Sequence, residues 1–158
     1  MKKVIKKKQK TLRYRRHRVK KALEKRKNIK SFTPTVEQCQ SWFRTLNRTI
    51  FRKHLEEPTF VVRGMRLDWG ICIADWDNRK CRKGTFNQDL IPYHVPIDYR
   101  IELHNKFPTW KDFIETLAHE MVHLYQMTWL KDPYSNHNSN FYAWRAKFNA
   151  SGLNLSRC

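Results

Sequence analysis

The spacing of apolar residues changes twice along the chain and predicts helices that flank a group of strands. Thr33 and Pro34 form the pattern of a helix N-cap followed by proline. Behind them, apolar side chains recur every three or four positions and predict a helix from about Pro34 to His54, at Val36, Cys39, Phe43, Leu46 and Ile50. Strands are predicted over 60–63, 67–76 and 95–103, which are rich in Val, Ile and aromatic residues, and a polar turn at 77–84 suggests a hairpin.

Two further helices are predicted in the second half of the chain. Thr109 can cap a helix with Asp112 in its first turn. This helix runs to about Trp129, and because most of its surface is apolar we expect it to be buried. A last helix, ending near Gly152, carries apolar residues on one side at Phe141, Trp144 and Phe148. The order of helix, strands and two helices predicts an α+β domain with a small antiparallel β-meander.

The basic residues gather near the N-terminus. The chain has 33 Lys and Arg against 14 Asp and Glu, a formal net charge of +19. Residues 1–30 hold 16 of the basic residues and one acidic residue, so this segment carries +15, whereas residues 31–158 carry +4. So dense a cluster repels itself. We therefore expect a basic arm over 1–30, disordered when free, and a globular domain over 31–158.

A phosphate-binding role is predicted for this arm, because a dense run of Lys and Arg releases many counterions from DNA or RNA. The arm would give affinity without sequence preference. A second basic cluster, in the predicted turn, could continue the same track. The candidate nucleic-acid contacts are Lys6, Lys7, Lys8, Lys10, Arg13, Arg15, Arg16, Arg18, Lys20, Lys21, Arg79, Lys80, Arg82 and Lys83.

The predicted buried helix contains an HExxH motif at residues 119–123. Residues four apart share a helical face, so His119 and His123 can bind one metal ion while Glu120 reaches the water bound to it. Without a metal, these three groups would be buried on an apolar helix without partners, which costs on the order of several kcal/mol. We predict one Zn²⁺ ion, with Glu120 as the base that takes the proton of the water and delivers it to the leaving amine.

A catalytic zinc site has three protein ligands and one open position, so a third ligand is required. The HExxHxxGxxH spacing would place it at Trp129, and no glutamate follows Glu120. Among strong ligands downstream of His123, Asp132 and His137 remain. His137 is preferred because it lies at the head of the last helix, which can fold back over the HExxH helix, and Asp132 is the alternative.

These motifs resemble the SprT/Spartan-like zinc metallopeptidases over nearly all of residues 33–155. The likeness includes residues 46–51 at the end of the first helix, 69–72 in the hairpin and 101–103 before the HExxH segment at 115–123. His137 and Phe141 have the spacing of that family's His-Gly-x-x-Phe, with Asn138 in place of the glycine. The resemblance implies a zincin-like fold and an endopeptidase acting on DNA-associated or DNA-crosslinked proteins. Because the chain ends at Cys158 without paired cysteines, we expect a minimal member that lacks the C-terminal zinc ribbon.

Several other classes of protein are disfavoured by the sequence. It has no run of 18 apolar residues and no apolar stretch behind its charged head, so neither a membrane span nor a secretory signal is predicted. We expect a cytoplasmic monomer, associated with the nucleoid or with DNA, or located in the host cytoplasm if the protein is viral. The alternative is a non-catalytic, zinc-containing accessory or packing protein that binds nucleic acid. Glu120 argues against it, since a purely structural metal site needs no base beside the metal.

Overall fold

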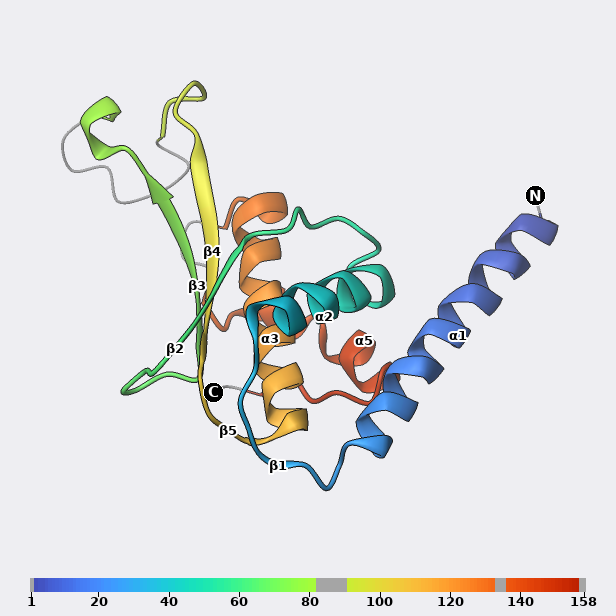
Figure 1. Cartoon of the computed structure of the whole chain (residues 1–158). Coiled ribbons are helices and arrows are strands. Elements are labelled where there is room, and N and C mark those ends of the chain that lie inside the picture. Colours follow the sequence, from blue (N-terminus) through green and yellow to red (C-terminus); the bar gives the residue numbers. More distant parts are fainter. Residues whose placement is uncertain (1, 82–90, 133–135, 157–158) are drawn as a thin grey trace.

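The computed structural model describes residues 2–81, 91–132 and 136–156, and the side chains of residues 2–8 lie outside this description. The elements in chain order are α1 (Lys2–Lys25), β1 (Lys30–Phe32), α2 (Val36–Thr49), β2 (Thr59–Arg63), β3 (Gly70–Trp76), the 3-10 helix η1 (Asn78–Lys80), β4 (Ile97–His104), β5 (Phe107–Thr109), α3 (Trp110–Tyr125), the π-helix η3 (Gln126–Leu130), α4 (Ser139–Tyr142) and α5 (Arg145–Ala150). Figure 1 shows β2, β3 and β4 along one side of α3, with α5 and α1 beyond its other side. The predicted α+β class is confirmed.

Helix α3 forms the centre of the core. Its N-cap is Thr109, as predicted, and the Thr109 hydroxyl accepts a hydrogen bond from the backbone N–H of Asp112 at 3.1 Å. Nearly every face of α3 is buried, so it has to be covered all round. The strands β3, β4, β5 and the helix α2 supply that cover. At its C-terminal end the chain continues as η3. This turn ends at its C-cap Lys131, whose backbone is left-handed with φ 52°.

The strands form a mixed sheet instead of the predicted antiparallel meander. Strand β4 lies in the middle, with β3 antiparallel to it on one edge and β2 parallel to it on the other. The expected antiparallel pairing of β3 with β4 is present, with Cys72 opposite Ile101. Strand β2 lies beyond β4 because Phe60 is buried there against Phe43 of α2, at 5.7 Å between ring centroids. Strands β1 and β5 form a separate antiparallel pair.

Helix α2 begins two residues later than predicted and ends earlier. Its cap is Thr35, whose hydroxyl accepts from the Gln38 N–H at 3.2 Å, while the Gln38 side chain accepts from the Thr35 N–H at 3.0 Å. This reciprocal capping box satisfies two N–H groups that the first turn leaves unpaired. Near the other end, the buried Asn47 amide donates to the Leu55 carbonyl at 2.7 Å and accepts from the Leu55 N–H. The chain therefore turns back where the sequence suggested more helix.

Helix α1 includes most of residues 1–30, for which a separate, disordered arm is predicted. Its second half packs on the domain, because Val19 and Leu23 are 1% and 7% exposed and belong to the common core. Its first half projects away from the rest of the molecule (Figure 1). Burial of apolar side chains holds the second half in place despite the self-repulsion of the segment. The domain boundary at residue 30 and the behaviour of the free arm stay predictions.

The predicted last helix is divided into two short ones, α4 and α5. Phe141 of α4 and Phe148 of α5 are fully buried, so the predicted apolar side of this segment does face the core.

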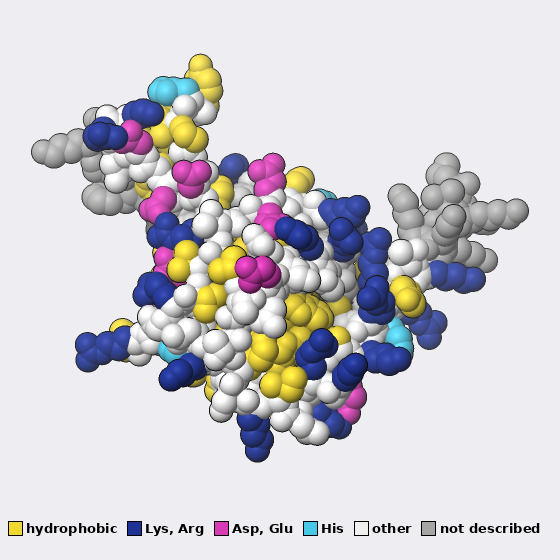
Figure 2. Space-filling model, in the orientation of Figure 1, with side chains coloured by type: hydrophobic (Ala, Val, Ile, Leu, Met, Phe, Trp, Pro, Cys, Tyr) yellow, Lys and Arg dark blue, Asp and Glu magenta, His cyan; other side chains and the backbone are white. Residues whose placement is uncertain are grey.

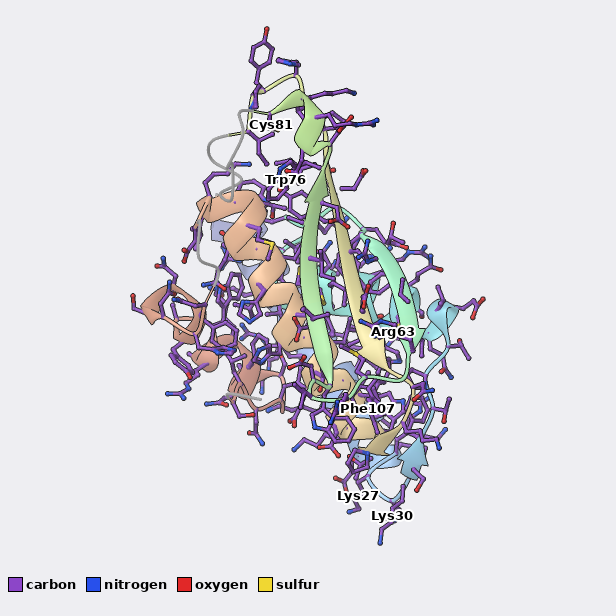
Figure 3. All side chains as sticks on the ribbon, turned by 90° about the vertical axis from the view of Figure 1, so that its left-hand side faces the viewer. Lys27, Lys30, Arg63, Trp76, Cys81 and Phe107 are labelled. Atoms are coloured by element: carbon purple, nitrogen blue, oxygen red, sulfur yellow. The ribbon has the colours of Figure 1, made fainter. Side chains whose placement is uncertain are left out.

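Figure 3 shows the long axis of the sheet, with Trp76 and Cys81 at one end and Phe107 at the other. No helix among the described residues is long and apolar enough to cross a membrane.

Candidate metal centre

Three imidazole rings meet beside α3. His119 and His123 lie on one face of this helix, and His137 comes from the segment just before α4. The Nε2 atom of His119 lies 3.2 Å from Nε2 of His123 and 2.9 Å from Nε2 of His137. One ligand atom from each ring lies within 4.8 Å of the other two. The structure thus brings together the three histidines named from the sequence.

Asp132, the alternative third ligand, has a different place. Its Oδ2 atom accepts hydrogen bonds from Asn138 Nδ2 at 2.7 Å and from Gln126 Nε2 at 3.3 Å. It therefore belongs to the surroundings of the histidines rather than to the converging group. Asn138, where the resembled family has glycine, caps α4, and its Oδ1 accepts from the Phe141 N–H at 3.2 Å.

Hydrogen bonds behind the rings fix which imidazole nitrogen carries the proton. His119 Nδ1 lies 3.1 Å from the carbonyl oxygen of Ser156, and His123 Nδ1 lies 2.9 Å from Oε1 of Gln126. These oxygens can only accept, so both Nδ1 atoms carry hydrogen and both Nε2 lone pairs face the centre. Burial, followed by the neighbouring imidazoles of His123 and His137, lowers the pKa of His119 to about 3. The Nε2 lone pairs of His119 and His123, with the Nε2 atom of His137 beside them, form a donor set that fits a metal cation.

One buried aromatic side chain, Phe141, contacts all three imidazole rings. The ring of Phe141, fully buried, lies 4.7 Å from His119, 4.9 Å from His123 and 4.6 Å from His137 between ring centroids. A wide aromatic ring in contact with each imidazole limits how far any of them can tilt. Because Phe141 belongs to α4, the packing of this helix also affects the orientation of the three histidine rings.

Glu120 lies between the metal centre and β3. Glu120 is 4% exposed, and its carboxyl group accepts a hydrogen bond from the backbone N–H of Cys72. Burial is the main reason that the pKa of Glu120 rises to about 8; the Cys72 N–H opposes this rise and the charge of Asp68 adds to it. A Cβ atom on Gly70 would lie 2.7 Å from Thr116 Cγ2 and 3.0 Å from Glu120 Oε1. Glycine at this position allows β3 to approach α3 so closely.

The site opens into a cavity of about 260 Å³ between α3 and β3. Glu120, the three histidines and residues 67–72 line it, together with Met127. A second cavity of about 260 Å³ adjoins it at Trp69 and His119 and is lined also by Phe107, Asp112 and Glu115. Trp69 is 42% exposed and packs at a tilt against His104 and Phe107, with centroid distances of 5.1 and 5.6 Å. The linings of the two cavities share Trp69 and His119, so the second cavity lies directly beside the metal centre.

The candidate nucleic-acid contacts on α1 have described side chains from Lys10 onward. Those side chains are exposed or half-buried, and they are Lys10, Arg13, Arg15, Arg16, Arg18, Lys20 and Lys21. Arg15 and Arg18 line a groove of about 430 Å³ between α1 and α2, together with Arg26, Trp42 and Arg48. Figure 2 shows Lys and Arg side chains gathered on the side of the molecule where α1 lies, at the right of the view.

The second predicted basic cluster lies far from α1. Arg79 and Lys80 form part of η1 and pair with Asp77 at 3.0 and 3.8 Å. Figure 1 shows the short helix that follows β3 on the opposite side of the molecule from α1. The two clusters therefore do not make one track, because the β3–β4 ribbon carries the turn away from the helices. Arg82 and Lys83 lie outside the described residues, as do the side chains of Lys6, Lys7 and Lys8.

Three groups that orient the site are missing from the sequence analysis. Gln126 follows His123 by three residues, so helical spacing could have identified it. The carbonyl of Ser156 and the N–H of Cys72 are backbone groups, and their positions depend on how distant parts of the chain pack. No side-chain pattern in the sequence indicates them.

A model of the SprT-like family matches residues 39–158. The matched stretch contains the sheet, the HExxH helix and all three histidines, and it begins after the basic helix α1. No curated protein matches the chain.

Proposed function

The chain belongs to the SprT-like family, and we propose that it is a zinc-dependent endopeptidase that cleaves DNA-associated or DNA-crosslinked proteins. Its domain is metallopeptidase-like, and its three histidines could hold a metal ion. The observation that carries the proposal is that the histidines and Glu120 line one cavity, next to an edge strand. A base placed beside a three-imidazole site is the arrangement that metal-assisted hydrolysis requires.

The donor set favours zinc. Three imidazoles whose Nε2 atoms lie close together match the ligands of catalytic zinc, and they would leave one position open. Bound there, Zn²⁺ supplies the Lewis acidity that polarises a peptide carbonyl and lowers the pKa of water to about 7. Ser156 and Gln126 hold the His119 and His123 rings in the required tautomer.

Glu120 acts in this proposal as general base and then as general acid. Its carboxylate takes a proton from the attacking water and passes it to the nitrogen of the leaving amine. Burial raises the pKa of Glu120 to about 8. A divalent cation held by the three histidines would favour the charged carboxylate, which is the form that a general base needs.

The substrate is proposed to lie along β3. This strand is at the edge of its sheet, and its first residues line the cavity of the metal centre. An extended peptide can pair with the backbone groups of an edge strand, which places a peptide bond next to Glu120. The exposed Trp69 and Leu67 offer apolar contacts on the same side.

The DNA part of the proposal rests on charge and shape. The groove between α1 and α2 is lined by four arginines and by the hydroxyl residues Ser41, Thr45 and Thr49, and no acidic residue among those that the structure describes lines it. Guanidinium groups suit phosphate oxygens, and clustered charges bind a polyanion without reading its sequence. We propose DNA as this partner and a monomer as the acting form.

Cleavage of a basic DNA-bound protein tests the proposal. Zinc-loaded wild type, Glu120→Gln and the control Glu37→Gln, an exposed change on α2, are incubated with the target, each with and without DNA. We expect wild type and Glu37→Gln to cleave when DNA is present, and Glu120→Gln to bind zinc without cleaving. If zinc-loaded wild type binds DNA tightly and cleaves nothing, the non-catalytic accessory protein becomes the better explanation.

A further inference from the structure

Gln126 occupies a special position behind the metal centre. It is the first residue of η3, the π-helical turn that follows α3, and its side chain is 0% exposed. π-Helical turns are uncommon and often occur at functional sites. A buried carboxamide needs hydrogen-bond partners for its oxygen and for both of its N–H groups.

The surroundings of Gln126 determine how its amide is oriented. Its Nε2 atom faces three oxygens: the Asn136 carbonyl at 3.0 Å, Asn138 Oδ1 at 3.2 Å and Asp132 Oδ2 at 3.3 Å. A backbone carbonyl and a carboxylate can only accept, so the NH₂ group has to point toward them. Oε1 then faces Nδ1 of His123 at 2.9 Å, and this nitrogen has to carry the proton.

The same amide reaches the segment that carries His137. Two of its acceptors belong to Asn136 and Asn138, the residues on either side of that histidine. Asn138 in turn caps α4 with its Oδ1 and donates its Nδ2 hydrogen to Asp132 at 2.7 Å. The Gln126 side chain therefore connects His123 on α3 with the segment that carries His137.

We propose that Gln126 is a positioning residue of the metal centre, which sets the tautomer of His123 and ties the His137 segment to α3. Asp132 and Asn138 hold its amide in the orientation that this requires. Gln126 can have this role only if the three histidines bind a metal, as proposed above. A glycine at position 138 would have no side chain for this hydrogen-bond network, whereas Asn138 bonds Gln126, Asp132 and the Phe141 N–H.

Three variants of the full-length chain separate the two tasks of Gln126. Gln126→Met keeps the length of the side chain and removes all its hydrogen bonds. Gln126→Glu keeps an acceptor for His123 but turns a carboxylate toward Asp132 and the Asn136 carbonyl. Adding Asp132→Asn to Gln126→Glu removes one of the two negative charges and supplies an amide that can donate to the new carboxylate.

The first measurement is the Zn²⁺ dissociation constant, from competition with a chromophoric chelator. Loss of a hydrogen-bond partner behind a ligand weakens metal binding by about 10–100-fold, and we expect this for Gln126→Met. Gln126→Glu should also bind zinc more weakly, and the added Asp132→Asn should recover part of the loss. The matched control is Asn47→Leu, which removes a buried amide that bonds both backbone groups of Leu55 and does not line the cavity of the metal centre. This control should lose stability and keep the zinc affinity of wild type.

The second measurement is the ¹⁵N spectrum of the histidine rings, which reports the tautomer directly. His123 should be protonated at Nδ1 in wild type and in Gln126→Glu, and should show a mixture of tautomers in Gln126→Met. A folded Gln126→Met variant with wild-type zinc affinity and an unchanged His123 tautomer would overturn the assignment of Gln126 while the metal site stands. If wild type itself binds no zinc, the proposed function fails and the role of Gln126 fails with it.

Discussion

Replacing Gly70 by alanine tests whether close contact between β3 and α3 builds the site. The added Cβ would lie 2.7 Å from Thr116 Cγ2 and 3.0 Å from two atoms of Glu120. Thr116 is 6% exposed, and a β-branched side chain in a helix has one or two accessible χ1 values, so its methyl group has little room to move. Overpacking of this kind costs about 1–3 kcal/mol. For a domain of this size that corresponds to a decrease in Tm of about 2–12 °C.

Thermal unfolding and zinc titration of four proteins measure this effect: wild type, Gly70→Ala, Thr116→Ser and the double variant. Thr116→Ser removes the methyl group that Cβ would meet, so the double variant should recover part of the lost Tm. Peptidase activity should decrease more than zinc affinity in Gly70→Ala. The added Cβ on β3 meets Glu120, which would be displaced, and it meets none of the three histidines. Equal Tm values for wild type and Gly70→Ala, or no recovery in the double variant, would refute the packing argument.

Three further predictions concern the ligands, the charges of the sheet and the basic groove. His137→Ala should weaken zinc binding in a metal titration, and full retention of affinity would return Asp132 to consideration. Burial by itself raises the pKa of Glu102, but hydrogen bonds from Arg63 and Arg100 outweigh it and hold the pKa below its ordinary value of 4.5. Because the folded-state pKa is the lower one, this stabilisation is present above about pH 4.5 and is lost as the pH falls through the folded-state pKa. The difference in Tm between wild type and Glu102→Gln should therefore shrink on acidification from pH 6 to pH 3, and a constant difference would contradict this. Arg18→Ala and Arg48→Ala should each weaken DNA binding and lower the slope of log K against log salt by about one, whereas Arg79→Ala, at the far end of the sheet, should change neither.

Local signals in the sequence predicted the centre of the fold well. The cap at Thr109, the buried helix behind it and the HExxH spacing all depend on residues within a few turns of one another. His137, which elimination left as the preferred third ligand, does lie beside the other two rings, and its binding of a metal stays a prediction. Such features need no knowledge of which distant segments pack together.

The features that sequence reasoning did not find are long-range. Parallel pairing of β2 with β4 depends on burial of Phe60 beneath α2, and docking of α1 depends on surfaces that accept Val19 and Leu23. Gln126 is close to His123 in the chain, yet its partners Asn136 and Asn138 are placed by a different segment. Neither propensity nor periodicity contains that information.

The contacts around the metal centre also have a consequence for how the chain holds together. His137, Phe141 and the carbonyl of Ser156 all come from the C-terminal segment, and each of them meets the HExxH face of α3. A metal held by the three rings would act as a reversible cross-link between these two parts of the chain, similar in effect to a disulfide. Metal supply would then control the local unfolding of the C-terminal segment, and with it the susceptibility of the protein to degradation.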